Sequence, residues 1–297
     1  MLGRTEATRP WCRALSGITA RNRLVGVVAA VVLALGGVEL RAEPVPVRYT
    51  EGLVHGFLAL RTTGGRTIAD GDLNQVANGA QVTARLTFHF YDGSLHDETA
   101  VYTQREQFRL VTYRLIQRGP SFPRPLDMSI DAGSGQVTVR YTDDEGEAKT
   151  ESERLELPPD VANGLISTLL KNVRPGAVPP LSYVAATPKP RLVKLEIATA
   201  ASDRLAVGRQ GRTAAHYVIK VEIGGLSGLI APLIGKQPPD SHVWIMGGDT
   251  PAFVKAEQSL YVGGPIWRIE LTSPAWPREA APKAAPGPKA AAPAKKP

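Results

Sequence analysis

Two histidines and a glutamate lie close together in the sequence and have side chains that can bind a metal ion. His89, His96 and Glu98 flank the turn residues Asp92 and Gly93. If Asp92 and Gly93 alone form a two-residue hairpin turn, His89 lies directly opposite His96 on the neighbouring strand. The two β-carbons would then be about 4.5–5.5 Å apart, with Glu98 on the same face. Because two imidazoles and one carboxylate are a common ligand set, this register predicts a metal site.

A turn that is one residue longer separates the two histidines. If Gly93 forms a bulge in a three-residue turn, His89 pairs with Leu95 and Phe88 pairs with His96. A shift of one residue places the histidines on opposite faces of the sheet, where they cannot share an ion. A metal-dependent enzyme is therefore the third of three functional hypotheses, and no other cofactor is expected.

Other catalytic signals are absent from the sequence. It contains no glycine-rich phosphate loop and no dinucleotide-binding glycine motif, and it lacks the serine-nucleophile and zinc-protease motifs. The acidic run at residues 143–147 lacks the ligand spacing of a calcium-binding loop, which favours a solvated turn. We therefore predict no catalytic residue and expect a non-enzymatic protein.

The elements that must position these side chains are mainly strands. In His216–Ile223, apolar and polar residues alternate as expected for a half-buried antiparallel strand. Glycine-containing turns separate many similar segments. The pattern predicts a large curved antiparallel meander, either a half-barrel or an open barrel. The other alternating segments are Gln136–Tyr141, Thr150–Leu157, Arg191–Ala198, Ser241–Met246 and Ile266–Leu271.

Two apolar segments interrupt the alternation. Residues 159–173 carry apolar side chains at helical spacing, begin beside Asp160 and end before Pro175, so they predict an amphipathic helix. Residues 223–235 contain no charge and are too short to span a membrane. We interpret residues 226–235 as a short buried apolar helix, with a lid or lipid-facing loop as the alternative.

The first 42 residues indicate where the protein goes. A basic lead-in precedes the uncharged stretch Leu24–Val38, and Leu40-Arg41-Ala42 precedes Glu43. The stretch is shorter than the roughly 18–20 residues that span a bilayer. We therefore interpret residues 1–42 as a signal peptide and expect export to the periplasm or the cell exterior. A retained N-terminal membrane anchor is the alternative.

The charge and the cysteine content divide the chain into three parts. The net charge of +7 comes from the ends, since residues 1–42 and 278–297 each carry +4 and residues 43–277 carry −1. A nearly neutral body argues against a nucleic-acid partner. The only cysteine is Cys12, so a processed chain forms no disulfide. We predict a single β-rich domain over 43–277 and a disordered Ala/Pro/Lys tail over 278–297.

The order of the predicted elements suggests a family. With its strands, a signal, and a mid-chain helix after Leu155-Glu156-Leu157-Pro158-Pro159-Asp160, the chain resembles uncharacterised bacterial envelope proteins with a LolA/LolB-like half-barrel. The resemblance covers roughly residues 45–275 and departs in lacking a helix before the first strand. It implies a curved sheet wrapped around helices, whose concave apolar face carries a lipoprotein acyl chain in the characterised members.

These observations lead to two main functional hypotheses. The first is an exported envelope protein that binds or carries a hydrophobic, lipid-like ligand in an apolar groove. The second is an envelope interaction or scaffold protein with a filled core, whose tail contacts a protein or an anionic surface. Cavity volume separates them, because a drug-sized site needs roughly 300 Å³ or more. The residues expected to line the groove are Leu165, Leu169, Leu229, Ile230, Leu233 and Trp244.

Overall fold

The computed structural model describes residues 44–272 except 177, 208–209 and 223–237. The chain divides into two units, Met1–Arg41 and Ala42–Pro297, and all described residues belong to the second. The predicted signal peptide, the tail over 278–297 and the apolar segment over 226–235 lie outside the described residues. Among the residues that are described, no helix is long and apolar enough to cross a membrane.

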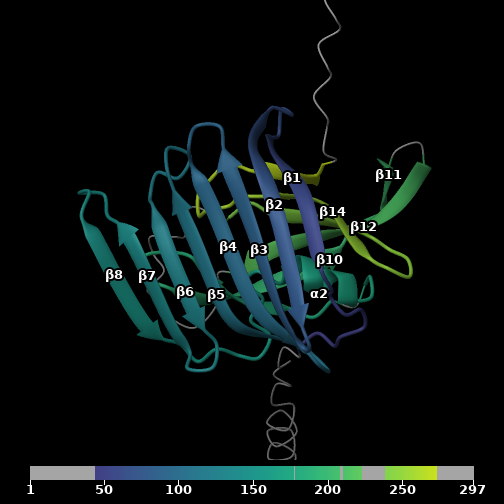
Figure 1. Ribbon diagram of the computed structural model, residues 1–297, viewed down its shortest axis with the longest axis horizontal. Coiled ribbons are helices and arrows are strands. Elements are labelled where there is room, and N and C mark those ends of the chain that lie inside the picture. Colours follow the sequence, from purple (N-terminus) through teal and green to yellow (C-terminus); the bar gives the residue numbers. More distant parts are fainter. Residues whose placement is uncertain (1–43, 177, 208–209, 223–237, 273–297) are drawn as a thin grey trace, which may run out of the picture. The chain divides into compact units, whose positions relative to one another are not determined.

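The fold is mainly β, as predicted. The described residues form one sheet of 15 strands in the order β8-β7-β6-β5-β4-β3-β2-β1-β15-β14-β13-β12-β10-β9, with β11 paired to β12 (Figure 1). Neighbouring strands are antiparallel, and β8 and β9 end the sheet, so the sheet is open. The strands of the first half are β1 Val54–Thr62, β2 Thr67–Asn78, β3 Gln81–Phe90, β4 Leu95–Gln104, β5 Phe108–Arg118, β6 Leu126–Asp131, β7 Gln136–Thr142 and β8 Ala148–Arg154. Those of the second half are β9 Leu181–Ala185, β10 Arg191–Thr199, β11 Asp203–Val207, β12 Gln210–Glu222, β13 Ser241–Met246, β14 Ala252–Gln258 and β15 Trp267–Leu271.

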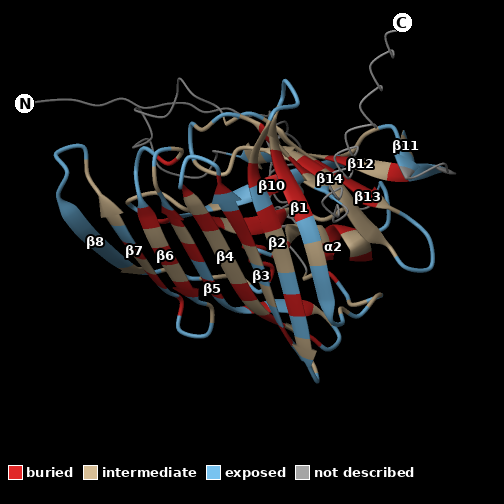
Figure 2. Ribbon diagram, turned by 45° about the horizontal axis from the view of Figure 1, so that its top comes forward, coloured by how far each residue is buried: buried red, intermediate tan, exposed pale blue. Residues whose placement is uncertain are grey.

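The sheet has two arms that meet at the pairing of β1 with β15. One arm runs from β1 to β8 as consecutive hairpins, and the other contains β9 to β15. Along β4, the side chains of His96, Ala100 and Tyr102 are buried on one face, which we call the inner face. Aromatic rings from both arms meet on this face, since Phe122 lies 6.2 Å from Trp267 between ring centroids. Figure 2 shows buried residues along the central strands, whereas the edge strand β8 contains none.

The helix α2, Ile166–Asn172, is shorter than predicted. The prediction of a helix over 159–173 is wrong for residues 159–165. Asp160 does not cap a helix: its Oδ2 accepts hydrogen bonds from the backbone N–H and the hydroxyl of Ser182, at 3.0 and 2.9 Å. Side-chain bonds of this kind compete with helical hydrogen bonding, so the segment follows β9 instead of coiling.

Asn163 and Gly164 also hold this segment in place, and we call residues 160–164 the anchor. Asn163 Oδ1 accepts a hydrogen bond from the Val184 N–H at 2.9 Å, and its amide donates to the Val184 carbonyl at 3.0 Å. Gly164 has φ +72°, a conformation that glycine adopts at little cost. The ideal Cβ of a larger residue there would lie 2.6 Å from Ala100 Cβ, so this segment touches the inner face of β4. The anchor therefore carries α2 over the inner face.

The residues before β1 contact the first residue of β5 and the helix α2. Val45 is buried, and its carbonyl accepts a hydrogen bond from the Phe108 N–H at 3.1 Å. Asn172 Oδ1 accepts from the backbone N–H groups of Arg48 and Tyr49, at 2.8 and 2.7 Å. Glu51 forms an ion pair with Lys171 of α2. The segment 45–51, which we call the N-terminal strap, thus ties the start of the folded unit to β5 and α2.

Candidate functional site

The turn between β3 and β4 has the longer of the two predicted forms. His89 pairs with Leu95, and Phe88 pairs with His96. Gly93 has φ +85°, as the bulge requires. His89 is exposed and His96 is buried, so they lie on opposite faces. The metal site of His89, His96 and Glu98 is therefore not assembled, and no cluster of three or more metal-binding residues occurs among the described residues.

His96 and Glu98 nevertheless share the inner face. His96 Nε2 lies 3.9 Å from Glu98 Oε2, too far for a hydrogen bond. The other carboxylate oxygen, Oε1, accepts a hydrogen bond from the Tyr113 hydroxyl at 2.9 Å. Tyr113 belongs to β5, so two adjacent strands hold this group in place.

The tautomer of His96 follows from its neighbours. The Gln117 amide nitrogen lies 3.0 Å from His96 Nδ1 and donates to the Leu260 carbonyl at 2.7 Å. A donor facing Nδ1 makes this nitrogen the acceptor and leaves the proton of a neutral imidazole on Nε2. His96 Nε2 is buried without a hydrogen-bond partner. Leaving a buried donor unsatisfied costs about 1–3 kcal/mol, so the site holds an N–H group available to an oxygen acceptor.

Two phenols surround the carboxylate. Burial raises the pKa of Tyr113 well above its usual value, and the nearby Glu98 and Tyr183 raise it further. Burial likewise raises the pKa of Tyr183 on β9, with Glu98 contributing. Both hydroxyls therefore keep their protons at neutral pH and can act as hydrogen-bond donors.

The inner face is open to solvent at Glu98. The Glu98 side chain is 21% exposed, whereas that of His96 is 4% exposed. Leu86 lies directly opposite Glu98 on β3, Leu73 lies opposite Leu86 on β2, and both are only partly buried. Leu73 and Leu86 thus form a partly exposed apolar row across β2 and β3, next to the Glu98 carboxylate on β4. We call the group His96, Glu98, Tyr113, Tyr183, Leu73 and Leu86 the inner-face site.

The predicted groove is not formed by its described members. Leu165 and Leu169 are buried in the core, 1% and 4% exposed. Trp244 lies on the opposite, outward face, because its strand neighbours Val243 and Ile245 occupy the core. Its placement in the groove was wrong. Leu229, Ile230 and Leu233 lie outside the described residues.

Polar contacts hold Trp244 on the outward face. Its indole N–H donates to Asp203 Oδ2 at 2.6 Å, and the Lys255 ammonium lies 3.8 Å from the ring centroid. Trp244 is only 6% exposed there, so its ring stays buried although it points away from the main core, and the carboxylate and the cation satisfy its N–H and its ring face. The alternation of β13 therefore decides its face.

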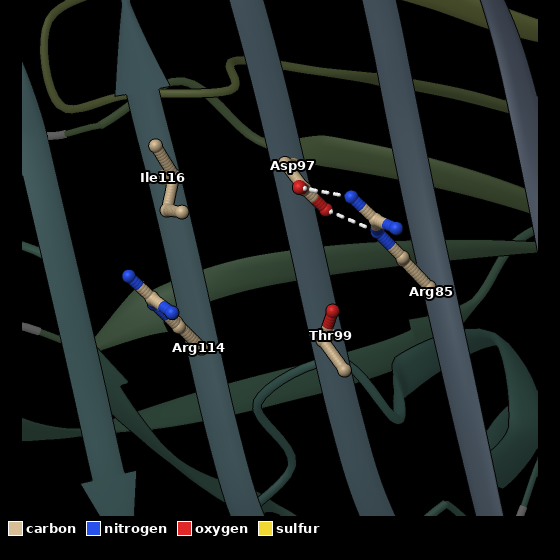
Figure 3. A pocket seen from close by; sticks show the side chains of 5 residues that line it. All are labelled: Arg85, Asp97, Thr99, Arg114 and Ile116. Carbon is tan, nitrogen blue, oxygen red and sulfur yellow. Dashed lines mark hydrogen bonds and ion pairs between the residues drawn. The ribbon is translucent and has the colours of Figure 1, made fainter.

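An open depression on the outward face of β3, β4 and β5 has a volume of about 230 Å³. Figure 3 shows Arg85 reaching across to Asp97, with bonds of 2.8 and 2.6 Å, beside Thr99, Arg114 and Ile116. The hydrogen bonds from Arg85 are the main cause that lowers the pKa of Asp97. This volume is below the roughly 300 Å³ of a drug-sized pocket, and the lining is largely charged. The depression is therefore no candidate for a hydrophobic ligand.

Sequence reasoning missed most of the inner-face site. Tyr113, Gln117 and Tyr183 come from β5 and β9, and no local pattern says which strands their side chains meet. Alternation alone does place His96 and Glu98 on one face. The unpartnered Nε2 follows from a contact with Leu260, 143 residues away from Gln117, which only the folded sheet reveals.

Comparisons with known proteins add little. No protein-family model and no curated protein match the chain. Among solved structures, it is similar to a β-barrel-like protein of a domain of unknown function, DUF1849, from Brucella abortus. The TM-score is 0.42 at 8% sequence identity, over 75% of this chain and 98% of that chain. A likeness this distant says nothing about function, and the expected resemblance to LolA/LolB proteins stays an expectation.

Proposed function

We propose that the protein is a non-enzymatic envelope protein that binds a hydrophobic, lipid-like ligand on the inner face. The observation that supports the proposal most is the 21% exposure of Glu98, a carboxylate placed among apolar side chains on the face that forms the core. The Tyr113 hydroxyl is a partner for Oε1 only, and a carboxylate in a filled core would need partners for both oxygens, because burying an incompletely hydrogen-bonded charge is costly. An accessible row of leucines beside it suits the hydrocarbon part of a ligand.

The polar groups of the site suit a neutral head group. His96 offers an N–H that lacks an acceptor, and Glu98 offers Oε2 as an acceptor. A hydroxyl oxygen at about 2.8 Å from each atom would bridge the 3.9 Å between them, accepting from one and donating to the other. A carboxylate head would be repelled by Glu98. We therefore expect a long-chain alcohol or monoacylglycerol to bind more tightly than a fatty acid.

The test compares two carboxylates on one strand. Protein recovered from the envelope is examined by mass spectrometry for bound lipid, and a fluorescent long-chain alcohol and the matching fatty acid are titrated into it. We expect saturable binding that favours the alcohol. The variant Glu98→Gln should bind the fatty acid more tightly than the unmodified protein does. Asp97→Asn, on the outward face beside it in sequence, should leave both affinities unchanged.

Failure of this test has a clear form. Absence of bound lipid, together with no saturable binding of either probe, would remove the ligand-binding proposal. Equal binding of both probes by the unmodified protein and by Glu98→Gln would remove only the role of the head group.

An interaction or scaffold protein is the second candidate, favoured by dense packing at one end of the inner face. Phe90, Phe122 and Trp267 contact one another with ring centroids 5.3–6.2 Å apart. Such packing leaves no room for a ligand there. This candidate predicts that deleting residues 278–297 abolishes association with an envelope partner or an anionic surface while the melting temperature stays the same. A lower melting temperature would show instead that the tail packs on the folded unit.

A further inference from the structure

A second histidine pair lies on the outward face, away from the inner-face site. His216 of β12 lies opposite Trp244 of β13, and His242 lies two residues before Trp244 on the same strand. Tyr217 and Val243, their neighbours in sequence, are buried in the core, so both histidines point outward. His216 Nε2 and His242 Nδ1 are joined by a hydrogen bond of 2.9 Å, so one of these two nitrogens carries a proton that points at the other.

We propose that His216 and His242 form a binding site for a divalent transition metal ion, preferably Cu²⁺. Two imidazole nitrogens bound at about 2.0–2.1 Å are about 2.8–3.0 Å apart when they subtend 90°, and about 3.3–3.4 Å apart in a tetrahedron. A cation that replaces the proton of the 2.9 Å hydrogen bond can bind both nitrogens at a right angle while their separation stays the same. Square-planar and tetragonal sites of this kind suit Cu²⁺ and Ni²⁺, and Cu²⁺ binds more tightly in the usual affinity order. Zn²⁺, which prefers a tetrahedron, fits less well.

The surroundings of His216 favour the tautomer that a metal requires. To coordinate through Nε2, His216 must carry its proton on Nδ1, and this atom lies 3.7 Å from Asp203 Oδ2. Trp244 holds that carboxylate through its indole N–H, and its ring stacks on His216 with centroids 4.2 Å apart. A carboxylate behind a ligating imidazole orients the ring and strengthens its basicity.

Solvent and charge determine what completes the site. The side chain of His216 is 17% exposed, so water can supply the remaining ligands. Glu257 lies directly opposite His242 on β14, but Lys255 and Arg268 already bind its carboxylate, at 3.2 and 2.9 Å. The positive charge of Lys255 opposes a bound cation. The variant Lys255→Met should therefore bind Cu²⁺ more tightly.

Trp244 provides a direct readout. Cu²⁺ is titrated into the full chain while tryptophan fluorescence is recorded, and electron paramagnetic resonance reports how many nitrogens bind the ion. We expect one Cu²⁺ with two imidazole ligands and quenching of Trp244. His216→Gln and His242→Gln should each lower the affinity at least tenfold, and His89→Gln, an isolated exposed histidine, should not. Trp244→Phe should remove most of the quenching without removing the resonance signal.

Two results would overturn the site. One is a resonance spectrum of the unmodified protein without two imidazole nitrogens, which does not depend on whether any variant folds. The other is Cu²⁺ affinity that is unchanged in both histidine variants. Zn²⁺ binding as tight as that of Cu²⁺ would overturn the right-angle geometry from which the choice of metal follows.

Discussion

At the scale of single residues, the inner-face site depends on Gln117 as much as on His96. One amide group faces the imidazole and holds the Leu260 carbonyl, so it links β5 to the residues before β15. This arrangement fixes which nitrogen of His96 carries the proton. The N–H group that His96 offers to a ligand beside Glu98 therefore depends on Gln117, which does not contact Glu98 itself.

The first prediction concerns this amide. Gln117→Leu removes the donor and leaves two acceptors without this partner, the buried His96 Nδ1 and the partly buried Leu260 carbonyl. We expect the free energy of unfolding to fall by about 1–3 kcal/mol, measured by urea denaturation. The control is Arg118→Leu at the exposed neighbour, which should change stability by no more than about 0.5 kcal/mol. Equal effects of the two variants would contradict the role of Gln117.

The second prediction concerns acid stability at the outward depression. Hydrogen bonds from Arg85 lower the pKa of Asp97 in the folded state below its value in the unfolded chain. The unfolded chain therefore binds the proton first, and the stabilisation is present above about pH 4 and lost as the pH falls through the folded pKa. Arg85 is largely exposed, so water and salt screen the pair, and we expect about 0.5–1 kcal/mol at pH 7.

The measurement for this pair is urea denaturation between pH 2 and pH 7. Asp97→Asn should be less stable than the unmodified protein at pH 7 and should show a flatter decline towards low pH. Because both proteins lack the ion pair at the lowest pH, the difference between them should vanish there. A difference that stays constant across the range would indicate a packing effect.

At the scale of elements, the alternation of apolar and polar residues predicted the strands well, but it did not predict their register or their contacts with distant segments. The antiparallel meander is present, whereas the register at Gly93 depended on a one-residue difference in turn length that the sequence left open. The prediction of a helix is wrong for residues 159–165 because Asp160 and Asn163 bind β9, which lies about 20 residues later. Trp244 was misplaced because hydrophobicity does not show which face a strand turns to the core. Long-range pairing decided each of these cases.

The third prediction belongs to the anchor before α2. Gly164→Ala forces a side chain into a positive φ and brings its Cβ to 2.6 Å from Ala100 Cβ. Strain and overpacking together should lower stability by about 2–4 kcal/mol. Gly93→Ala is the matched control, because Gly93 has φ +85° but no atom within 4 Å of the added Cβ. It should cost about 1–2 kcal/mol, the strain alone.

The comparison of these two glycines by thermal unfolding isolates the contact between the anchor and β4. Equal losses of stability in Gly164→Ala and Gly93→Ala would mean that β4 accommodates the added methyl group without cost. Because Ala100 lies next to Glu98 on the inner face, Gly164→Ala should also weaken binding of the long-chain alcohol probe, and Gly93→Ala should not.

At the scale of the whole molecule, two segments hold the sheet around the inner face. The N-terminal strap binds β5 and α2, and the anchor at residues 160–164 binds β9 and touches β4. Both arms of the sheet contribute to one core. The strap has a further consequence, because it lies immediately after the proposed cleavage site.

The last prediction concerns processing at that site. We propose that residues 1–42 are removed during export, so protein recovered from the envelope should begin near Glu43 and lack Cys12. The structure makes cleavage there compatible with a stable fold, since Val45 is already buried and is bound by Phe108. N-terminal sequencing and mass spectrometry test this directly. A start at Met1 in a carbonate-resistant membrane fraction would indicate a retained anchor, and a start at Met1 in the cytosol would refute export.

A pair of truncations tests the physical basis of the same boundary. Deleting residues 1–42 should leave the melting temperature of the folded unit unchanged, because the strap stays complete. Deleting residues 1–47 removes Val45 from the core, its backbone bond to Phe108 and the bond from Val47 to Glu106, and should lower stability by about 2 kcal/mol or more. If the shorter deletion destabilises the protein as much as the longer one, then residues before Glu43 contribute to the fold. A signal peptide that is cleaved away could not do so, and the retained form would be the functional one.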